Sequence, residues 1–170
     1  MVPQSPIVTI FGGSGFIGRY ITRRMARAGW RVRVACRRPN EAIFVRTYGV
    51  VGQVEPVLAN IRDDALVATA LRGSDAAVFS VGILAPTGKQ TFDAVQADGA
   101  GRVARLAAAE GISNYVHLSA IGADADSDSA YARTKAEGEA YVAEHQARAV
   151  VLRPSVVFGP EDQFFNRFAS

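Results

Sequence analysis

The sequence holds little of what a cross-linked, metal-binding or membrane-spanning protein needs. Cys36 is its only cysteine, so no disulfide can form within the chain and a reducing compartment is expected. His117 and His145 have no second His or Cys at ligand spacing, so no metal site is expected. No apolar run reaches the roughly 20 residues that span a bilayer. Residues 1–6 are fewer than a signal or transit peptide needs, so neither is expected.

Length and composition indicate one globular domain. The chain has 170 residues, of which 49% are hydrophobic and 21% charged, and these values exclude a disordered protein. Charge is uneven: residues 1–48 hold nine arginines and one acidic residue, whereas the remainder has a net charge of −5. A basic half can serve a phosphorylated small molecule, a membrane surface or nucleic acid, or can simply be a solvated face. Nucleic-acid binding is not expected, because the sequence has no helix–turn–helix or basic–aromatic platform.

Short β-branched runs alternate with segments of helical periodicity along the whole chain. Alternation of this kind predicts βαβ crossovers and an α/β fold with a doubly wound parallel sheet of about six strands. Gly29, Gly73 and Gly111 are placed to end three of the helices. The predicted strands are residues 7–11, 30–36, 54–58, 76–81, 115–119 and 149–152, and the predicted helices are residues 16–25, 42–48, 63–71, 92–110 and 129–145.

A glycine-rich turn lies between the first predicted strand and the first predicted helix. Gly12, Gly15 and Gly18 are spaced as in a dinucleotide-binding turn, and the strand–turn–helix context makes this pattern more than a chance match. Gly12 permits the tight turn, Gly15 lets backbone N–H groups approach a pyrophosphate, and Gly18 lets the helix pack close to the sheet. The helix N-terminus adds partial positive charge for the phosphates. The alternative is a tight turn without a ligand.

The end of the second strand predicts which dinucleotide binds. An acidic residue at this place usually accepts a hydrogen bond from the adenosine ribose 2′-hydroxyl, but this chain has Arg37 and Arg38 there. Arginine attracts a 2′-phosphate and can bind it bidentately, and Arg19 could join the pair. The sequence therefore favours NADP(H) over NAD(H), unless these arginines are solvated turn residues.

Tyr131 and Lys135 lie four residues apart on a predicted helix and therefore on one face. A neighbouring ammonium is expected to lower the pKa of the phenol, which would make it a better acid–base catalyst. Ser119 ends a strand at the edge where a parallel sheet presents groups to its ligand, so it could bind a substrate carbonyl oxygen. An ordinary surface pair is the alternative for Tyr131 and Lys135.

With these motifs, and with the stretch from Leu152 to Pro160, the whole chain resembles the extended or atypical short-chain dehydrogenase/reductase superfamily. The resemblance implies that Tyr131 is a general acid, that Lys135 also binds the nicotinamide ribose and that Ser119 orients the substrate. It implies a cofactor site built from Gly12, Ser14, Gly15, Phe16, Ile17, Gly18, Arg19, Arg37, Arg38, Asn60, Ile61, Val81, Gly82, Tyr131, Lys135, Pro154 and Val156.

Residues 16–20, 129–139 and 159–169 are similar to the nucleotide-binding accessory subunits of respiratory complex I and their bacterial relatives. Members of that group hold NADPH largely as a structural ligand. The resemblance implies other subunits of a membrane respiratory complex as partners. It also implies a cytoplasmic location, with peripheral attachment to the inner face of the membrane as the open alternative.

The chain departs from the superfamily in three ways. Gln96 stands where extended members usually have an asparagine that supports a proton relay, and Asn60–Ile61 replace an aspartate that commonly meets the adenine. Relatives continue beyond the position of Ser170 with a C-terminal substrate lobe, so residues 1–170 are expected to be the cofactor-binding, N-terminal part of a longer protein. The first hypothesis is therefore a structural or assembly module that holds NADP(H). The second is an NADP-dependent reductase, or a sugar epimerase or dehydratase, that uses Ser119, Tyr131 and Lys135.

Overall fold

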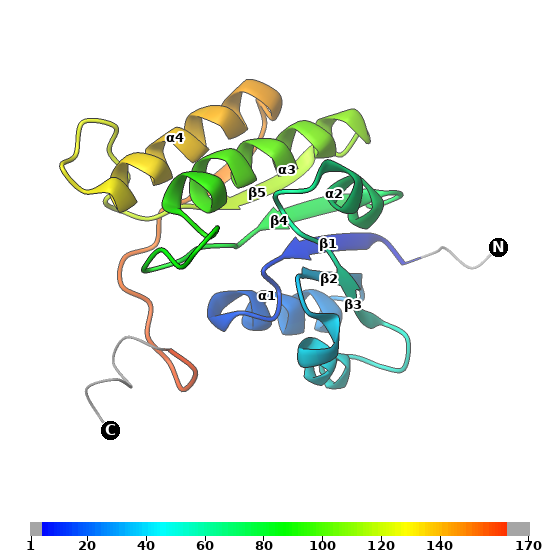
Figure 1. The fold of residues 1–170 in the computed structure, drawn as a ribbon. Helices are drawn as coiled ribbons and strands as arrows, with labels where there is room; N and C mark the ends of the chain where they lie inside the picture. Colours follow the sequence, from blue (N-terminus) through cyan, green and yellow to red (C-terminus); the bar gives the residue numbers. More distant parts are fainter. Residues whose placement is uncertain (1–4, 163–170) are drawn as a thin grey trace.

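A parallel β-sheet forms the centre of the protein (Figure 1), which we describe from a computed structural model for residues 5–162. The strand order is β3-β2-β1-β4-β5-β6, and every pair of neighbouring strands is parallel, which confirms the doubly wound α/β prediction. The strands are β1 (Ile7–Phe11), β2 (Arg31–Cys36), β3 (Val54–Leu58), β4 (Ala76–Phe79), β5 (Asn114–Leu118) and β6 (Val150–Leu152).

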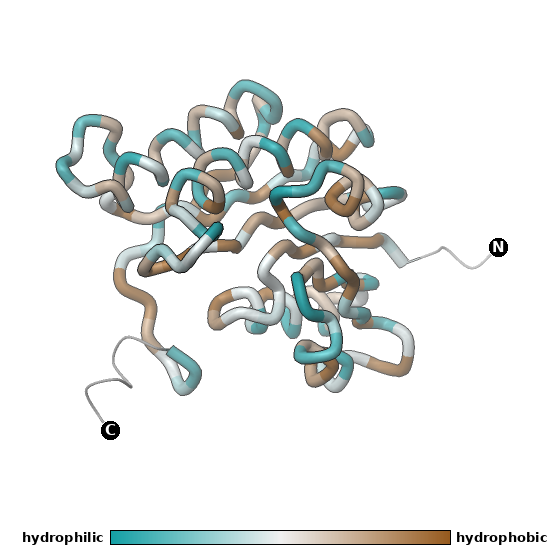
Figure 2. The backbone as a smooth tube through the Cα atoms, in the orientation of Figure 1, coloured by the Kyte–Doolittle hydropathy of each residue, from teal (hydrophilic) through white to brown (hydrophobic). Residues whose placement is uncertain are grey.

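Helices cover both faces of the sheet. The α-helices are α1 (Phe16–Arg27), α2 (Asp64–Leu71), α3 (Asp98–Ala109) and α4 (Ala130–His145). Two further helical segments are the 3₁₀ helix η1 (Pro39–Tyr48) and the π-helical segment η2 (Asp93–Ala97). In Figure 1, α2, α3 and α4 lie above the sheet, and α1 lies below it with η1. The hydrophobic colour follows the strands, whereas the outward turns of the upper helices are largely hydrophilic (Figure 2).

Each face of the sheet has its own hydrophobic core. Phe79 and Tyr115 pack with Val103 of α3 and Val142 of α4 on one face. Ile10 and Val34 belong to the core under α1 and η1. Successive strand residues point to opposite faces, so a β-branched strand that is covered on both sides supplies both cores at once. Residues 5–162 contain no helix that is both long and apolar enough to cross a bilayer.

Three predicted element boundaries were wrong. Strand β4 ends at Phe79 rather than at residue 81, because Phe79 lies opposite Phe11, where its partner strand β1 ends. The helix expected over residues 92–110 is two elements, a π-helical segment and then α3. The short helix expected at residues 42–48 is the longer 3₁₀ helix η1. Residues 163–169, part of the complex I resemblance, lie outside the described residues.

Side-chain caps explain where two of the helices, α2 and α4, begin. Asp63 caps α2, where its side chain accepts a hydrogen bond from the Leu66 N–H at 3.1 Å. Ser129 caps α4 in the same manner, towards the N–H of Ala132. Both caps satisfy backbone donors that a helix leaves free at its first turn. The cap at Ser129 sets the register in which α4 presents Tyr131 and Lys135.

Helices α3 and α4 approach each other closely because glycine is present at their contact. A Cβ atom at Gly138 would lie 2.1 Å from the carbonyl oxygen of Gln96, and one at Gly101 would lie 2.8 Å from Cβ of Tyr141. The first distance is far too short for any side chain, and the obstacle is backbone rather than a side chain that can turn away. The contact also holds the π-helical segment, which contains Gln96, against α4.

We therefore predict that Gly138→Ala lowers the free energy of unfolding by about 1–3 kcal/mol through overpacking. Helix propensity alone would make the alanine variant more stable by about 1 kcal/mol. A loss of stability would therefore indicate the clash and not helix propensity. Gly122→Ala is the control, because a Cβ at Gly122 meets nothing within 4 Å, and its stability should change by less than about 0.5 kcal/mol. Urea unfolding measures both, and equal stability of the two variants would contradict the predicted clash.

Candidate functional site

The carboxyl ends of all six strands meet at one edge of the sheet, and the predicted site residues gather there. Strand β1 pairs with β2 on one side and with β4 on the other, so the order of the strands reverses beside it. This switch point is where open α/β sheets bind their ligands. The residues that follow the strands, from β1 to β6 in sequence order, are Gly12–Arg19, Arg37 and Arg38, Asn60 and Ile61, Val81 and Gly82, Ser119, and Pro154 and Val156.

The glycine turn connects β1 to α1 in a geometry that other residues could not adopt. Gly12 has φ +79°, in the left-handed region that favours glycine, and a Cβ there would lie 2.9 Å from the Ser80 carbonyl oxygen. A Cβ at Gly18 would lie 2.0 Å from the Gly12 carbonyl oxygen. At Gly15, by contrast, the sole close neighbour is that same oxygen, at 3.2 Å. The fold therefore requires glycine at Gly12 and Gly18, whereas a Cβ at Gly15 would make one tight contact, with a backbone oxygen, and meet no other described atom within 4 Å.

The N-terminus of α1 is electropositive at this turn. No acidic residue lies in its first turn, so the partial positive charge of the helix end is not neutralised from within the helix. Arg19 folds back over the turn, and its guanidinium donates to the carbonyl oxygens of Ser14 and Gly15, each at 3.3 Å. The same guanidinium lies 5.1 Å from the centre of the Phe44 ring on η1. Arg19 therefore joins the turn after β1 to the helix after β2.

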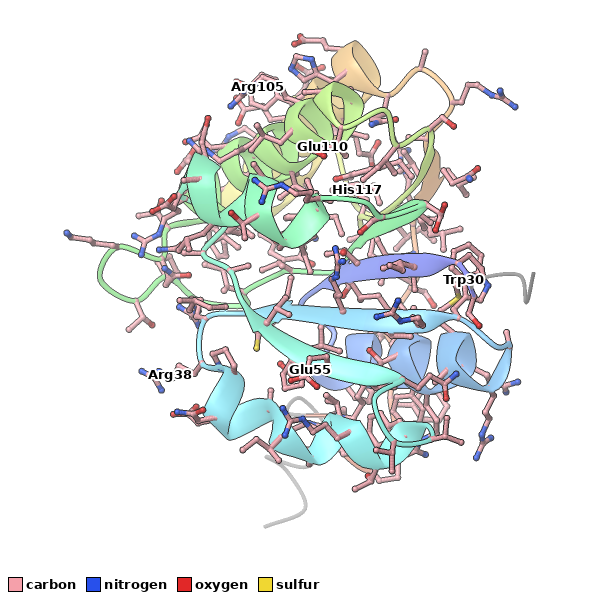
Figure 3. The ribbon with its side chains drawn as sticks, turned by 90° about the vertical axis from the view of Figure 1, so that its right-hand side faces the viewer. Trp30, Arg38, Glu55, Arg105, Glu110 and His117 are labelled. Atoms are coloured by element: carbon pink, nitrogen blue, oxygen red, sulfur yellow. The ribbon has the colours of Figure 1, made fainter. Side chains whose placement is uncertain are left out.

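Arg37 and Arg38 follow β2 and are both exposed. Arg38 lies at the opposite end of the β2 ribbon from Trp30 (Figure 3), which places it at the carboxyl edge. Its guanidinium lies 3.2 Å from the carboxylate of Glu41, with both side chains largely solvent-exposed. An exposed pair of this kind is weak and screened by salt, so Arg38 remains available to an anion.

The residues after β3 contribute less than the sequence suggests. The Ile61 side chain is buried, and its Cδ1 atom would lie 2.7 Å from a Cβ at Gly99. It is therefore part of the core, and only its backbone can face a ligand. The Asn60 side-chain oxygen accepts a hydrogen bond from the Arg62 N–H at 3.1 Å, which shapes the turn before α2.

A buried polar cluster lies where β4, β5, α4 and the π-helical segment meet. Lys135 is only 5% exposed, and its ammonium donates to the Leu118 carbonyl at 3.3 Å. A Cβ at Gly82 would lie 3.6 Å from Lys135 Nζ and 3.9 Å from Gln96 Oε1. Among the described residues, Gln96 Oε1 and Ser119 Oγ are buried without a hydrogen-bond partner of good geometry, although the Ser119 hydroxyl faces the Glu139 carboxylate and helps to lower its pKa. Unsatisfied buried polar atoms are costly, and here they converge on the place where a ligand would supply their partners.

The pKa of Lys135 is lowered to about 8 by burial, although the carboxylate of Glu139 opposes this shift. Tyr131 behaves differently from the sequence-based expectation, because burial raises the pKa of its phenol. The Lys135 ammonium lies 6.0 Å from the centre of the Tyr131 ring and is bonded to a backbone carbonyl. The expectation that Lys135 lowers the pKa of Tyr131 is therefore wrong for this state. The Phe92 ring packs against the Tyr131 ring in an edge-to-face arrangement, with 5.8 Å between the ring centres.

Sequence reasoning missed two charged residues that support this cluster. Glu139 follows Lys135 by one helical turn and receives hydrogen bonds on both oxygens from Arg153, at 2.9 and 2.5 Å. Burial raises the pKa of Glu139, but its hydrogen bonds and the charge of Arg153 more than offset this, so the pKa lies below its usual value. The spacing Tyr131, Lys135, Glu139 places all three on one helix face and could have identified Glu139.

His117 lies beneath the same cluster and has no part in the predicted site. It is fully buried and stacks on the Phe79 ring at 5.4 Å. Burial lowers its pKa to about 4, and the Lys135 charge adds to this, so the imidazole is neutral. Among residues 5–162, no group of three or more His, Cys, Asp or Glu side chains is arranged to hold a metal ion.

Comparison with known proteins agrees with this geometry. A family described as NAD(P)H-binding matches residues 12–157. The chain is 34% identical over 164 residues to NADH dehydrogenase (ubiquinone) 1 alpha subcomplex subunit 9, mitochondrial, of Dictyostelium discoideum, which covers 96% of this chain and 46% of that protein. It is 31% identical over 156 residues to a ceramide reductase of Caulobacter vibrioides, covering 92% of this chain and 48% of the reductase. The chain thus spans about half the length of these relatives.

The fold also matches solved structures. The enzyme WbmH of Bordetella bronchiseptica, solved in complex with NAD⁺, superposes with a TM-score of 0.79 over 98% of this chain and 63% of WbmH. The two sequences are 20% identical, so this similarity establishes the fold alone.

The glycine turn generates a prediction that separates binding from folding. Gly15→Val should leave the protein folded, because it costs the helix cap at most about 1 kcal/mol, but its side chain should exclude a pyrophosphate. Saturating NADPH should stabilise the wild type against heat, by about 2.7 kcal/mol at a hundredfold excess over Kd, and leave the variant unchanged. Gly18→Ala is the comparison and should lose stability through a clash with the Gly12 carbonyl oxygen, as Gly138→Ala does with that of Gln96. A thermal shift in Gly15→Val equal to that of the wild type would place the nucleotide elsewhere.

Lys135 generates a prediction about pH. Its lowered pKa means that the unfolded chain binds more protons than the folded chain between pH 8 and pH 10.5, so its cost to stability is present at neutral pH and disappears as pH rises. Without nucleotide, Lys135→Met should therefore be more stable than the wild type at pH 7. The difference should fall by about 2–3 kcal/mol between pH 7 and pH 10 in urea titrations. A difference that does not change with pH would show that Lys135 is not buried as a charge.

Proposed function

Because the chain belongs to the NAD(P)H-binding family that matches residues 12–157, we propose that it is the dinucleotide-holding module of a protein related to the accessory subunits of NADH:ubiquinone oxidoreductase. In this proposal the nucleotide chiefly holds the fold together, and the module serves the assembly or stability of a larger complex. Other subunits of a respiratory complex are then its expected partners.

The observation that carries the proposal is a set of polar groups at the carboxyl edge of the sheet. We call it the cradle, and it extends from the glycine turn before α1 to Lys135, Gln96 and Ser119. Gly15 leaves space at the N-terminus of α1, where backbone N–H groups and the helix dipole favour a pyrophosphate. At the other end of the cradle, Lys135 has ammonium donors beyond the one that Leu118 accepts, and Gln96 and Ser119 have unpartnered buried oxygens. These groups fit a nicotinamide ribose and carboxamide, which offer both donors and acceptors.

The arginines near the glycine-turn end of the cradle support NADP(H) rather than NAD(H). Arg37 and Arg38 are exposed after β2, where an acidic residue would repel a 2′-phosphate. Arg19 adds a third guanidinium from the first turn of α1, on the side that faces η1. Guanidinium groups bind phosphate through paired, charge-assisted hydrogen bonds.

Two observations favour a holding role over catalysis. Burial raises the pKa of Tyr131, so the phenol remains a poor proton donor or acceptor at neutral pH in the unliganded domain. The side chain at the usual place of the relay asparagine is Gln96, whose amide nitrogen donates to Thr134 at 3.2 Å. A bound nicotinamide dinucleotide can supply or accept a hydride, but here the residues beside it serve mainly to hold it.

A reductase is the second candidate function. Tyr131 and Lys135 lie on one face of α4, with the ammonium 6.0 Å from the centre of the phenol ring, and Ser119 directly follows the neighbouring strand β5. The similarity to a ceramide reductase supports the same reading. In this reading Tyr131 donates a proton to a carbonyl substrate, Ser119 orients the carbonyl oxygen, and Lys135 holds the nicotinamide ribose.

The first prediction from this proposal concerns the choice of dinucleotide. NADPH should bind more tightly than NADH by about 1.5–3 kcal/mol, the range of charge-assisted hydrogen bonds. The double variant Arg37→Gln/Arg38→Gln should lose this preference, because it removes the donors for a 2′-phosphate. Arg31→Gln is the control, since Arg31 begins β2 at the opposite edge of the sheet. Titration calorimetry measures all three, and equal wild-type affinities for NADPH and NADH would refute the assignment.

The second prediction separates the module from the reductase. Tyr131→Phe removes only the hydroxyl, so NADPH affinity should stay within about twofold in either case. If the chain is an enzyme, carbonyl reduction should fall by about 10²–10⁴. We expect no such loss, and we expect assembly with partner subunits to proceed unchanged. Tyr141→Phe, on the same helix, is the control. Turnover at ordinary enzyme rates by the complete protein, abolished in Tyr131→Phe alone, would overturn the holding role.

A further inference from the structure

The segment that follows β6 connects the two ends of the cradle. In Figure 1 it is the orange-to-red stretch that runs down the carboxyl edge of the sheet, from the level of α4 to the level of α1. At its start, Arg153 is bonded through two nitrogens to Glu139 of α4. Towards its end, a Cβ at Gly159 would lie 3.2 Å from the Phe16 ring of α1. The segment therefore contacts the layers on both sides of the sheet.

Glu161 makes two polar contacts with α1. One oxygen of its carboxylate accepts a hydrogen bond from the Tyr20 hydroxyl at 2.5 Å, and the other lies 3.6 Å from Nη1 of Arg19. The Tyr20 hydroxyl also holds the pKa of Glu161 below its usual value, so the group is anionic at neutral pH. The carboxylate thus places a negative charge directly beside Arg19.

Arg19 is part of the phosphate-binding end of the cradle. Its guanidinium is tied to the carbonyls of Ser14 and Gly15, and the first turn of α1 has no acidic residue of its own. Glu161 therefore provides, from far along the chain, the anion that this helix end lacks. The Arg19 and Glu161 side chains are 25% and 33% exposed, so their pairing is partly hydrated and weak enough to exchange.

We propose that the Glu161 carboxylate is an internal anion that competes with a phosphate of the dinucleotide for Arg19. This rests on the proposed function. The pyrophosphate carries two negative charges in all, and a 2′-phosphate carries about 1.5 to 2, against one on the carboxylate. Either group can accept paired hydrogen bonds from a guanidinium, so it displaces Glu161 when the nucleotide binds. Binding then breaks the pairing of Glu161 with Arg19, one of the contacts that join the segment after β6 to α1.

The proposal predicts that Glu161 weakens nucleotide binding, so removing its charge should strengthen binding. Glu161→Gln removes the charge and keeps the size of the side chain. It should tighten NADPH binding about three- to tenfold at low ionic strength, and the gain should shrink at high salt because the repulsion is screened. Glu55→Gln is the matched control, since it also removes one negative charge from an ion pair, with Arg46, and Glu55 lies near the start of β3, away from the carboxyl edge.

The experiment is titration of NADPH into the wild type, Glu161→Gln, Glu55→Gln, Arg19→Gln and the double variant Arg19→Gln/Glu161→Gln. Thermal melting without nucleotide verifies that each variant is folded. We expect tighter binding by Glu161→Gln, no change beyond about twofold in Glu55→Gln, and loss of most of the gain when Arg19 is also replaced. Affinity of Glu161→Gln equal to or weaker than that of Glu55→Gln would overturn the proposal, as would a gain that persists without Arg19. Absence of binding by every folded variant, the wild type included, would instead refute the proposed function.

Discussion

The rest of the site depends on one close approach, that of the first turn of α1 to the end of β1. Only hydrogen fits at Gly18, because a methyl group would lie 2.0 Å from the Gly12 carbonyl oxygen. This contact fixes the N-terminus of α1 at the point where the strand order reverses, so the helix dipole and its free N–H groups face the ligand edge. The positive charge at this end comes from Arg19, which is held over the turn, and from Arg37 and Arg38, which follow β2 at the same edge of the sheet.

The opposite end of the cradle is organised by burial. Lys135 is kept in a dry environment that lowers its pKa, and it is bonded to a strand carbonyl while Gln96 and Ser119 keep unpaired oxygens beside it. A domain that leaves these groups unsatisfied gives up stability that a ligand can restore. In the proposed function, this is how a bound nucleotide stabilises the fold.

Most of the architecture was predictable because strand and helix periodicity, glycine stops and the glycine turn all report local constraints. The same holds for Gly12, Gly15 and Gly18, whose spacing reflects a steric requirement of the fold at Gly12 and Gly18 and a more open position at Gly15. The features that the sequence did not predict depend on tertiary contacts. The π-helical segment lies where the Gln96 carbonyl meets Gly138 of another helix, and the pKa of Tyr131 depends on burial that no spacing reveals. The pairing of Glu161 with Arg19 joins residues far apart in sequence, and only the folded chain shows it.

The central claim is that a dinucleotide lies along the carboxyl edge of the sheet with its pyrophosphate at the N-terminus of α1. Hydrogen–deuterium exchange with and without saturating NADPH tests it most directly. The account predicts slower exchange for the backbone amides of residues 13–19, for those after β4 at residues 81–83 and for those after β5 at residues 118–120. Residues 49–53, at the opposite edge, should not change. Protection confined to that opposite edge, or no protection in the glycine turn at saturating nucleotide, would contradict it.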